Sequence, residues 1–181
     1  MQLVEGWVDT AAKCPSPNFN ARPNVDDISL LVVHNISLPP KQYGGHFIEN
    51  FFQNCLDWDL HPYFKTIEGT EVSAHFLIKR DGSLIQFVSC LERAWHAGLS
   101  CFSGRENCND YSIGVELEGC DDEAYEVEQY RMLADLTRIL MLSYPQITEP
   151  RLVGHCDIAP GRKTDPGEFF EWSEFRTRLK D

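Results

Sequence analysis

No stretch of this sequence approaches the about 20 consecutive apolar residues that a membrane-spanning helix needs, so we expect no transmembrane segment. The first residues, Met-Gln-Leu-Val-Glu-Gly-Trp, also lack the basic start and the apolar run of a signal peptide. On both grounds the sequence predicts a cytoplasmic protein that does not act at a membrane.

Positive charge is scarce as well, because 16 lysines and arginines stand against 28 aspartates and glutamates, for a net charge of −12. General nucleic-acid binding depends on clustered positive charge, and the composition therefore argues against this function. An anionic ligand would have to meet a local basic patch such as Arg162-Lys163. No feature of the sequence indicates an obligate protein partner.

Cysteine pairs with C-x-x-C spacing are absent, and the seven cysteines are an odd number. The missing spacings argue against a structural zinc site, which is closed by four cysteine or histidine ligands at short spacings. In a cytoplasmic chain we expect reduced thiols, most of them small buried side chains.

The length of 181 residues suits one domain with a sizeable core, and no repeat or low-complexity segment divides it. We expect a single domain over residues 1–181. Residues 1–29 are rich in proline, asparagine and aspartate, and we expect them to form an irregular lead-in packed on the rest.

Short apolar runs and helical patterns follow one another along the rest of the chain. We expect strands at 30–34, 72–78, 84–88, 111–118 and 152–154, and helices at 46–55, 126–143 and 169–179. The pair Asp81-Gly82 predicts a hairpin. Together these elements indicate an α/β fold with a central mixed sheet flanked by helices. The segments 37–72 and 89–110 are expected to form the walls of a cleft, because long loops often have a functional role.

Three residues that are far apart in the sequence could form a catalytic metal site. His34 ends the strand at 30–34, His155 directly follows the strand at 152–154, and Asp165 lies ten residues further along. Two imidazoles and one carboxylate suit zinc and leave its fourth position open for water. Each residue alone is more typical of a hydrogen-bonded loop position, so the prediction depends on the fold bringing the three together.

Two glutamates lie on the polar face of the expected strand 111–118, namely Glu116 and Glu118. Gly114 leaves space beside Glu116, which could therefore face a cleft and act as general base toward a zinc-bound water. A solvated strand face is the alternative, and alternation along the strand does not separate the two glutamates.

Lys163 stands two residues before Asp165. In an extended segment, residues two apart point the same way, so both side chains would face the same site. An ammonium group there could stabilise the oxyanion of a tetrahedral intermediate. An exposed loop lysine is the alternative.

These residues lie within six ordered motifs that resemble the type 2 N-acetylmuramoyl-L-alanine amidases, and in particular the AmpD-type amidases of cytosolic 1,6-anhydro-muropeptides. The resemblance runs over nearly the whole chain, from Glu5-Gly-Trp7 to the C-terminal helix. The motifs are Leu31-Val-Val-His-Asn35, Val72-Ser-Ala-His75, Arg80-Asp-Gly82, Ala94-Trp-His-Ala-Gly98, Ser112-Ile-Gly-Val-Glu116, and Gly154-His155 through Lys163-Thr-Asp-Pro-Gly167.

The resemblance implies one zinc ion per chain and a role for each matching residue. It makes His34, His155 and Asp165 the zinc ligands. It makes Glu116 the catalytic base and Lys163 the residue that stabilises the transition state.

Other matching positions resemble substrate contacts, namely Asn35, Trp95 and His96. His75 lies in an apolar segment, and we expect it to be a hydrogen-bonded core histidine. AmpD-type sequences have arginine where this chain has Glu71 and Asn107. If those arginines bind the carboxylates of the stem peptide, this chain would recognise the peptide end of the substrate differently.

The implied reaction is hydrolysis of the amide bond between the lactyl group of anhydro-N-acetylmuramic acid and L-alanine. The implied substrate is a small soluble muropeptide in peptidoglycan recycling, with an indirect role in β-lactamase induction. Two alternatives remain open: an amidase of polymeric peptidoglycan, and a peptidoglycan-binding module without catalysis. A metallopeptidase that cuts within the stem peptide is a third.

Overall fold

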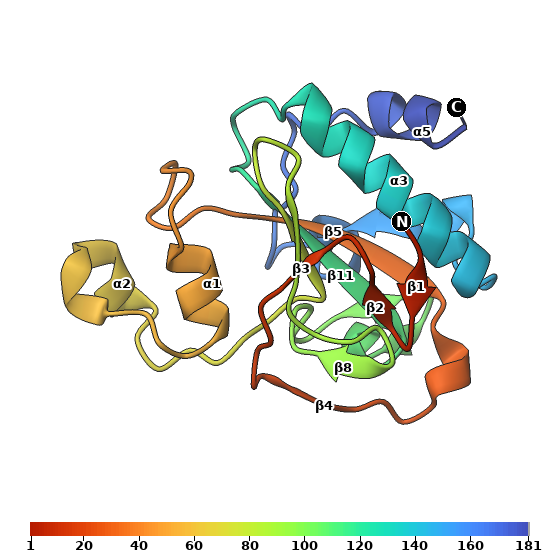
Figure 1. Cartoon of the computed structure of the whole chain (residues 1–181), viewed down its shortest axis with the longest axis horizontal. Coiled ribbons are helices and arrows are strands. Elements are labelled where there is room, and N and C mark those ends of the chain that lie inside the picture. Colours follow the sequence, from red (N-terminus) through yellow and green to blue (C-terminus); the bar gives the residue numbers. More distant parts are fainter. Residues whose placement is uncertain (181) are drawn as a thin grey trace.

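The core of the fold is a mixed sheet of six strands, seen in a computed structural model that describes residues 1–180 (Figure 1). The strands in sheet order are β12 (Leu152–Gly154), β5 (Leu30–Ile36), β11 (Ser112–Glu118), β6 (Phe76–Ile78), β7 (Leu84–Gln86) and β3 (Ala12–Lys13). The first four run parallel to their neighbours, whereas β7 is antiparallel to β6. The expected mixed α/β sheet is therefore confirmed.

The two central strands β5 and β11 are paired in parallel over seven positions, from Ser112 opposite Leu30 to Glu118 opposite Ile36. Most of their residues are buried, which is typical of parallel strands covered on both faces and explains the continuous apolar run of β5. The register sets Glu116 directly beside His34.

The hairpin between β6 and β7 turns at the predicted Asp81-Gly82 pair. Gly82 has a φ of +80°, a conformation that glycine adopts without steric cost. The Lys79 amide donates to the Ser83 carbonyl at 3.0 Å and closes the turn.

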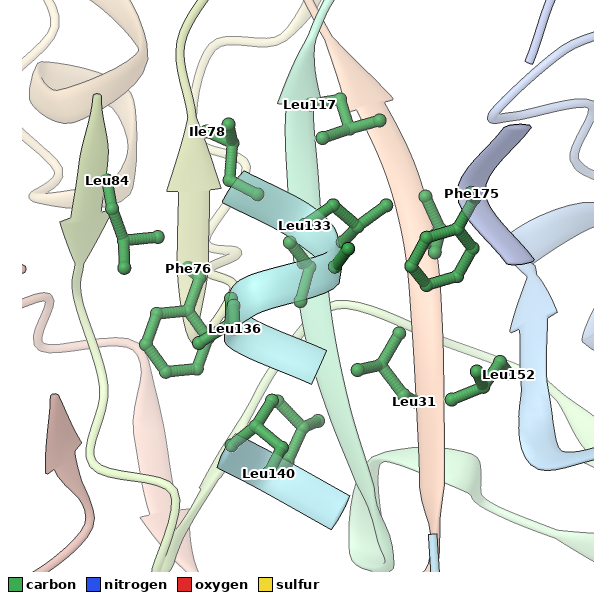
Figure 2. Packing of buried hydrophobic residues seen from close by; sticks show 14 of the residues in the cluster. Leu31, Phe76, Ile78, Leu84, Leu117, Leu133, Leu136, Leu140, Leu152 and Phe175 are labelled. Atoms are coloured by element: carbon green, nitrogen blue, oxygen red, sulfur yellow. The ribbon is translucent and has the colours of Figure 1, made fainter. Parts of the chain in front are cut away.

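Helices α3 (Val127–Ser143) and α5 (Trp172–Lys180) cover one face of the sheet (Figure 1). Helix α3 begins one residue after the predicted start, and at this end the side chain of Gln129 accepts from the Glu126 amide at 3.1 Å. The apolar stripe of this helix packs onto β5, β11 and β6, as Figure 2 shows for Leu133, Leu136 and Leu140.

The opposite face of the sheet is covered by the smaller elements and the loops. The segment 37–72 contains α1 (Phe47–Phe52) and α2 (Pro62–Thr66) and extends to one side of the sheet (Figure 1). The remaining elements are not confined to this face, and β1 (Leu3–Val4) contacts α3. The others are β2 (Trp7–Val8), β4 (Phe19–Ala21), β8 (Glu92–Ala94), β9 (Cys101–Phe102), β10 (Arg105–Glu106), α4 (His155–Ile158) and the 3₁₀ turns Val25–Asp27, Trp58–Leu60, Cys108–Asp110 and Glu149–Arg151.

Residues 1–29 are more regular than predicted, because they contain four short strands. Strands of two or three residues leave no periodic pattern in a sequence, and the same reason applies to β8, β9 and β10 in the segment expected to be irregular. None of the helices in residues 1–180 has the length and apolar character that crossing a membrane would require.

Candidate active site

His34 and Glu116 are two polar residues that lie side by side near the C-terminal ends of the two central strands. Each points away from α3, because the alternate residues of both strands, such as Val33 and Val115, pack under that helix. Both side chains are buried. The parallel register therefore places an imidazole and a carboxylate next to each other at the carboxyl ends of the strands.

His155 and Asp165 reach the same end of the sheet from the segment that follows β12. His155 begins α4 directly after β12, and the amide of Cys156 donates to the Asp165 carbonyl at 3.0 Å. Gly154 allows this loop to pass close by, because a Cβ at this position would lie 2.8 Å from Cδ of Pro166. The loop thus folds back so that Asp165 faces His155.

The three predicted metal ligands converge on one point. Nδ1 of His34 lies 2.9 Å from Nδ1 of His155, and Oδ2 of Asp165 lies 3.1 Å and 3.0 Å from these two nitrogens. Ligand atoms at roughly 2.0–2.2 Å from one tetrahedral zinc are separated by about 3.3 Å, which is close to these spacings. The donor set and its geometry therefore fit a zinc ion.

The electrostatics of His34 and Asp165 also suit a cation. Burial lowers the pKa of His34 to about 4, even though its hydrogen bond with Asp165 favours the protonated form, so this imidazole is neutral at pH 7. Burial alone would raise the pKa of Asp165, but hydrogen bonds with His155 and His34 outweigh it and lower the pKa well below the usual value. One carboxylate and unprotonated imidazoles are the ligand forms that zinc binds.

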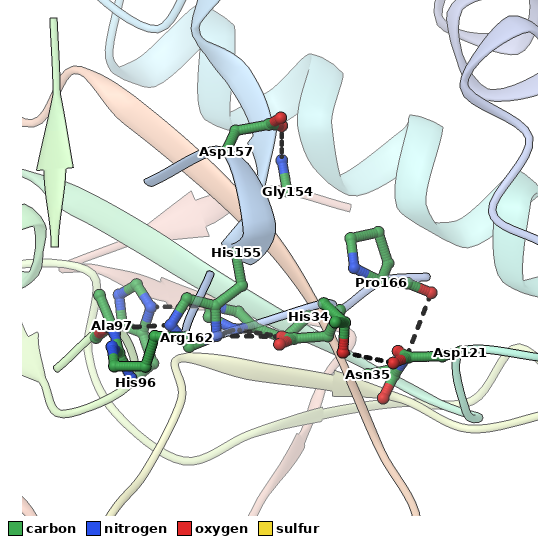
Figure 3. Close-up of polar contacts among 12 residues, drawn as sticks. His34, Asn35, His96, Ala97, Asp121, Gly154, His155, Asp157, Arg162 and Pro166 are labelled. Atoms are coloured by element: carbon green, nitrogen blue, oxygen red, sulfur yellow. Dashed lines mark hydrogen bonds and ion pairs between the residues drawn. The ribbon is translucent and has the colours of Figure 1, made fainter. Parts of the chain in front are cut away.

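Each histidine also has a partner for its second ring nitrogen (Figure 3). Nε2 of His155 lies 3.1 Å from the Ala97 carbonyl and donates to it. Arg162 donates to the same carbonyl at 2.7 Å. Nε2 of His34 lies 2.9 Å from Nδ1 of His96.

Glu116 and Glu118, which the sequence did not separate, have different surroundings. Glu118 is buried and accepts hydrogen bonds from the amides of Gly44 at 2.6 Å and Arg80 at 3.2 Å. Oε2 of Glu116 is buried and has no hydrogen-bond partner in the described part of the chain. Burial raises the pKa of Glu116 well above its usual value, and the negative charge of Asp165 adds to this effect.

The site opens into a cavity of about 690 Å³. Every predicted site residue lines it except Trp95. The segment 37–72 supplies most of one wall, including Phe51, Phe52 and Val72, as predicted, whereas His96 is the contribution of the segment 89–110.

Comparison with known proteins identifies the family. Residues 24–168, most of the chain, match the N-acetylmuramoyl-L-alanine amidase family. The chain belongs to this family.

Individual relatives of the amidase agree with this assignment. The 1,6-anhydro-N-acetylmuramyl-L-alanine amidase AmpD of Haemophilus influenzae is 51% identical over 98% of this chain and 97% of its own length. A crystal structure of an AmpD derivative superposes with a TM-score of 0.96 at 51% identity and covers 99% of both chains. The Escherichia coli amidase AmiD, in complex with the substrate anhydro-N-acetylmuramic acid-L-Ala-D-gamma-Glu-L-Lys, has a TM-score of 0.62 at 28% identity and covers 88% of this chain and 60% of that chain.

Lys163 of the amidase is exposed and lines the cavity together with Asp165, as their spacing predicted. The lysine ion pairs found in residues 1–180 are made by Lys41, Lys65 and Lys79. The ammonium of Lys163 therefore has no carboxylate partner in the described chain. Its positive charge counteracts the rise in the pKa of Glu116, so the two groups interact electrostatically.

Two of the predicted substrate contacts of the amidase have protein partners. The side-chain amide of Asn35 donates to Asp121 at 2.8 Å and to the Pro166 carbonyl at 3.1 Å, so it joins the end of β5 to the loop that contains Asp165 (Figure 3). The indole N–H of Trp95 donates to Asn20 at 2.9 Å. Asn35 lines the cavity, whereas Trp95 lies outside its lining.

The predicted core histidine of the amidase is found as expected. His75 is fully buried, and its Nδ1 accepts from the Gly114 amide at 3.0 Å while its Nε2 lies 3.1 Å from the Glu92 carbonyl. Glu71 and Asn107, the positions that depart from AmpD-type sequences, are both exposed and outside the lining of the cavity.

Some residues that organise the site were missed in the sequence. Oδ1 of Asn109 accepts from the amides of His96 at 3.1 Å and Ala97 at 2.8 Å, and this fixes the segment that contacts both histidine ligand candidates. Arg162 was noted only as part of a basic patch. A backbone carbonyl such as that of Ala97 leaves no signal in the sequence, and Asn109 lies in a stretch without periodicity.

Proposed function

We propose that the protein is a zinc-dependent amidase that hydrolyses the bond between the lactyl group of anhydro-N-acetylmuramic acid and L-alanine in soluble muropeptides. The observation on which this rests is the convergence of His34, His155 and Asp165 beside the unpartnered Glu116 carboxylate, in a chain of the amidase family. The names of the relatives support the anhydromuropeptide as substrate.

His34, His155 and Asp165 would hold the metal, and the cavity beside them would hold the scissile amide. When bound, zinc would supply a Lewis acid that polarises the carbonyl and makes water a stronger nucleophile. The proton transfers and the stabilisation of the transition state would then be the roles of Glu116 and Lys163.

Glu116 would act as general base and then as general acid. Its Oε2 would take a proton from the attacking water and later give it to the alanine nitrogen, as the C–N bond breaks. A carboxyl whose pKa is raised by burial suits both roles at neutral pH. The ammonium of Lys163 would stabilise the negative charge on the carbonyl oxygen in the tetrahedral transition state. Asn35, which lines the cavity, is the proposed substrate contact that the geometry supports best.

We further propose that the reaction takes place in the cytoplasm during peptidoglycan recycling. All seven cysteines are free thiols in the structure, which suits a reducing compartment. Removal of the peptide would also lower the level of muropeptides that act as signals for β-lactamase induction.

The test is incubation of zinc-loaded protein with an anhydromuramyl tripeptide, followed by mass spectrometry of the products. We expect release of the whole tripeptide, loss of this activity with a chelator, and recovery on addition of zinc. Glu116→Ala is the matched control, since it should keep the metal and lose turnover.

The other outcomes identify the alternatives. Cleavage within the peptide would indicate a metallopeptidase. Intact tripeptide substrate together with cleavage of isolated sacculi would indicate an amidase of polymeric peptidoglycan. Binding of either substrate without cleavage would indicate a peptidoglycan-binding module.

A further inference from the structure

His96 is connected to His34 through hydrogen bonds that continue to β11. Nε2 of His34 lies 2.9 Å from Nδ1 of His96, and Nε2 of His96 lies 3.1 Å from Oγ of Ser112 (Figure 3 shows His34 and His96). The rings of the two histidines meet edge to face with centroids 5.0 Å apart. The three side chains thus form one chain from the site into the sheet.

The space for the His96 ring is provided by a missing side chain. A Cβ at Gly114 would lie 2.5 Å from Cγ of His96 and 2.6 Å from its Nδ1. These atoms belong to the rigid part of the ring, which could not move aside without breaking its contact with His34. Glycine is therefore required at position 114 to leave room for the ring of His96, and not to form a turn.

The backbone of His96 is fixed as firmly as its ring. Its amide and that of Ala97 donate to Oδ1 of Asn109, at 3.1 Å and 2.8 Å. On the other side, the ring meets His75, with centroids 5.7 Å apart. Contacts from three directions thus determine where Nδ1 of His96 lies.

We infer that His96 is a positioning residue for His34. The chain His34–His96–Ser112 selects the tautomer in which Nδ1 of His34, the nitrogen that faces the metal site, carries no proton. In this tautomer the proton of His34 is on Nε2 and is donated to Nδ1 of His96. The proton of His96 is then on Nε2 and is donated to Oγ of Ser112. A hydroxyl can act as acceptor or donor, so Ser112 can complete the chain in this direction.

The inference rests on the metal-site part of the proposed function, and it differs from the predicted role of His96 as a substrate contact. Partners of the second ring nitrogen of a metal-bound histidine fix its orientation, and their loss lowers metal affinity by about 10–100-fold. A substrate contact would instead change KM and leave the affinity for zinc unaltered.

The first measurement is the dissociation constant of zinc, by competition with a chelator, for wild type and for His96→Phe, Ser112→Ala and Gly114→Ala. We expect the affinity to fall about 10–100-fold in His96→Phe and Gly114→Ala, and about tenfold in Ser112→Ala. His46→Gln, on an exposed residue whose ring pairs with Glu49, is the matched control and should bind zinc as wild type does. Ser112→Ala keeps the His96 ring, so it remains informative if His96→Phe does not fold.

The second measurement is nitrogen-15 NMR of the histidine rings in the zinc-loaded wild type. We expect both His34 and His96 to be protonated at Nε2. A proton on Nδ1 of His96, or wild-type zinc affinity in His96→Phe with a raised KM, would overturn the inference. A wild type that binds no zinc would overturn both proposals, whereas one that binds zinc without turnover would overturn the proposed function alone.

Discussion

Glu116 and Glu118 lie two residues apart on the same face of β11, and only Glu118 has its carboxylate satisfied by the protein. Two backbone amides donate to Glu118, whereas a buried oxygen of Glu116 has no partner in residues 1–180. A buried acceptor without a partner destabilises a fold and persists where function requires it. This difference favours Glu116 over Glu118 as the carboxylate that acts in the proposed reaction.

Replacing Glu116 by glutamine should stabilise the metal-free protein at neutral pH. The pKa of this carboxyl is raised in the folded state, chiefly by burial. Below about pH 4, near the pKa of an unfolded glutamate, the group is neutral in both states and the penalty is absent. As the pH rises through that value, the unfolded chain loses its proton first and wild type loses stability, until the pH passes the folded pKa. Urea unfolding of chelator-treated wild type and Glu116→Gln at pH 4 and pH 8 measures this, and an equal difference at both pH values would contradict it.

Replacing Glu118 by glutamine should have the opposite effect on stability. One of its two oxygens would become an amide that cannot accept from the Gly44 or Arg80 backbone. We expect a loss of about 1–3 kcal/mol in the free energy of unfolding, because one buried N–H loses its acceptor. Thermal unfolding of the same chelator-treated samples provides the comparison, and unchanged stability would show that these two hydrogen bonds do not hold the loop at Gly44.

Metal binding and turnover should be separable by two substitutions. Asp165→Ala removes an oxygen that lies about 3 Å from both imidazoles, and we expect loss of the bound zinc together with activity. Glu116→Ala should keep the zinc and lower kcat by about 10²–10⁴-fold. Zinc content by atomic emission and kcat on an anhydromuramyl tripeptide are the measurements. Retention of more than about a tenth of wild-type kcat in Glu116→Ala would refute its role as base.

Lys163→Met should affect catalysis and leave stability almost unchanged. The ammonium is exposed and has no carboxylate partner in the described chain, so the fold loses no ion pair. We expect kcat to fall by about 10²–10³-fold, as for the loss of one oxyanion-stabilising donor, with KM little altered. A rise in KM at constant kcat would instead assign Lys163 to substrate binding.

Arg22→Met should destabilise the protein without direct contact with the site. The guanidinium is buried and donates to the backbone carbonyls of Cys90, Asn109, Asp110 and Ser112, at 2.7 to 3.1 Å. Since several carbonyls would lose a donor at once, we expect a loss on the order of 3 kcal/mol or more. Arg131→Met, on an exposed face of α3, is the control and should change stability by less than about 0.5 kcal/mol.

The parts of the fold with a long periodic pattern could be predicted from the sequence. Helix α3 was expected at 126–143 and is found at Val127–Ser143, and β12 was predicted at its observed bounds. The hairpin at Gly82 followed from its dipeptide. By contrast, α2 begins at Pro62 after a His61 cap and has five residues, which is too short for a helical repeat to be recognised.

Three expected ligand positions converge as the prediction required, whereas the contacts that hold them in place could not be read from the sequence. Resemblance supplied the ligand set, and the structure brings His34, His155 and Asp165 together. The sequence could not show that Gly114 leaves room for the ring of His96 rather than for Glu116, because this depends on a loop that crosses the strand.

The groups that contact Nε2 of His155 and Nε2 of His34 differ in whether a substitution can remove them. His155 is hydrogen-bonded to a backbone carbonyl, which any amino acid at position 97 would provide if it fitted the buried space of Ala97. His34 is hydrogen-bonded to the imidazole of His96, which a single base change can remove. Evolution could therefore adjust the first support only by moving the chain, whereas the second is open to change one side chain at a time. A comparison of side chains among relatives would register one support and overlook the other.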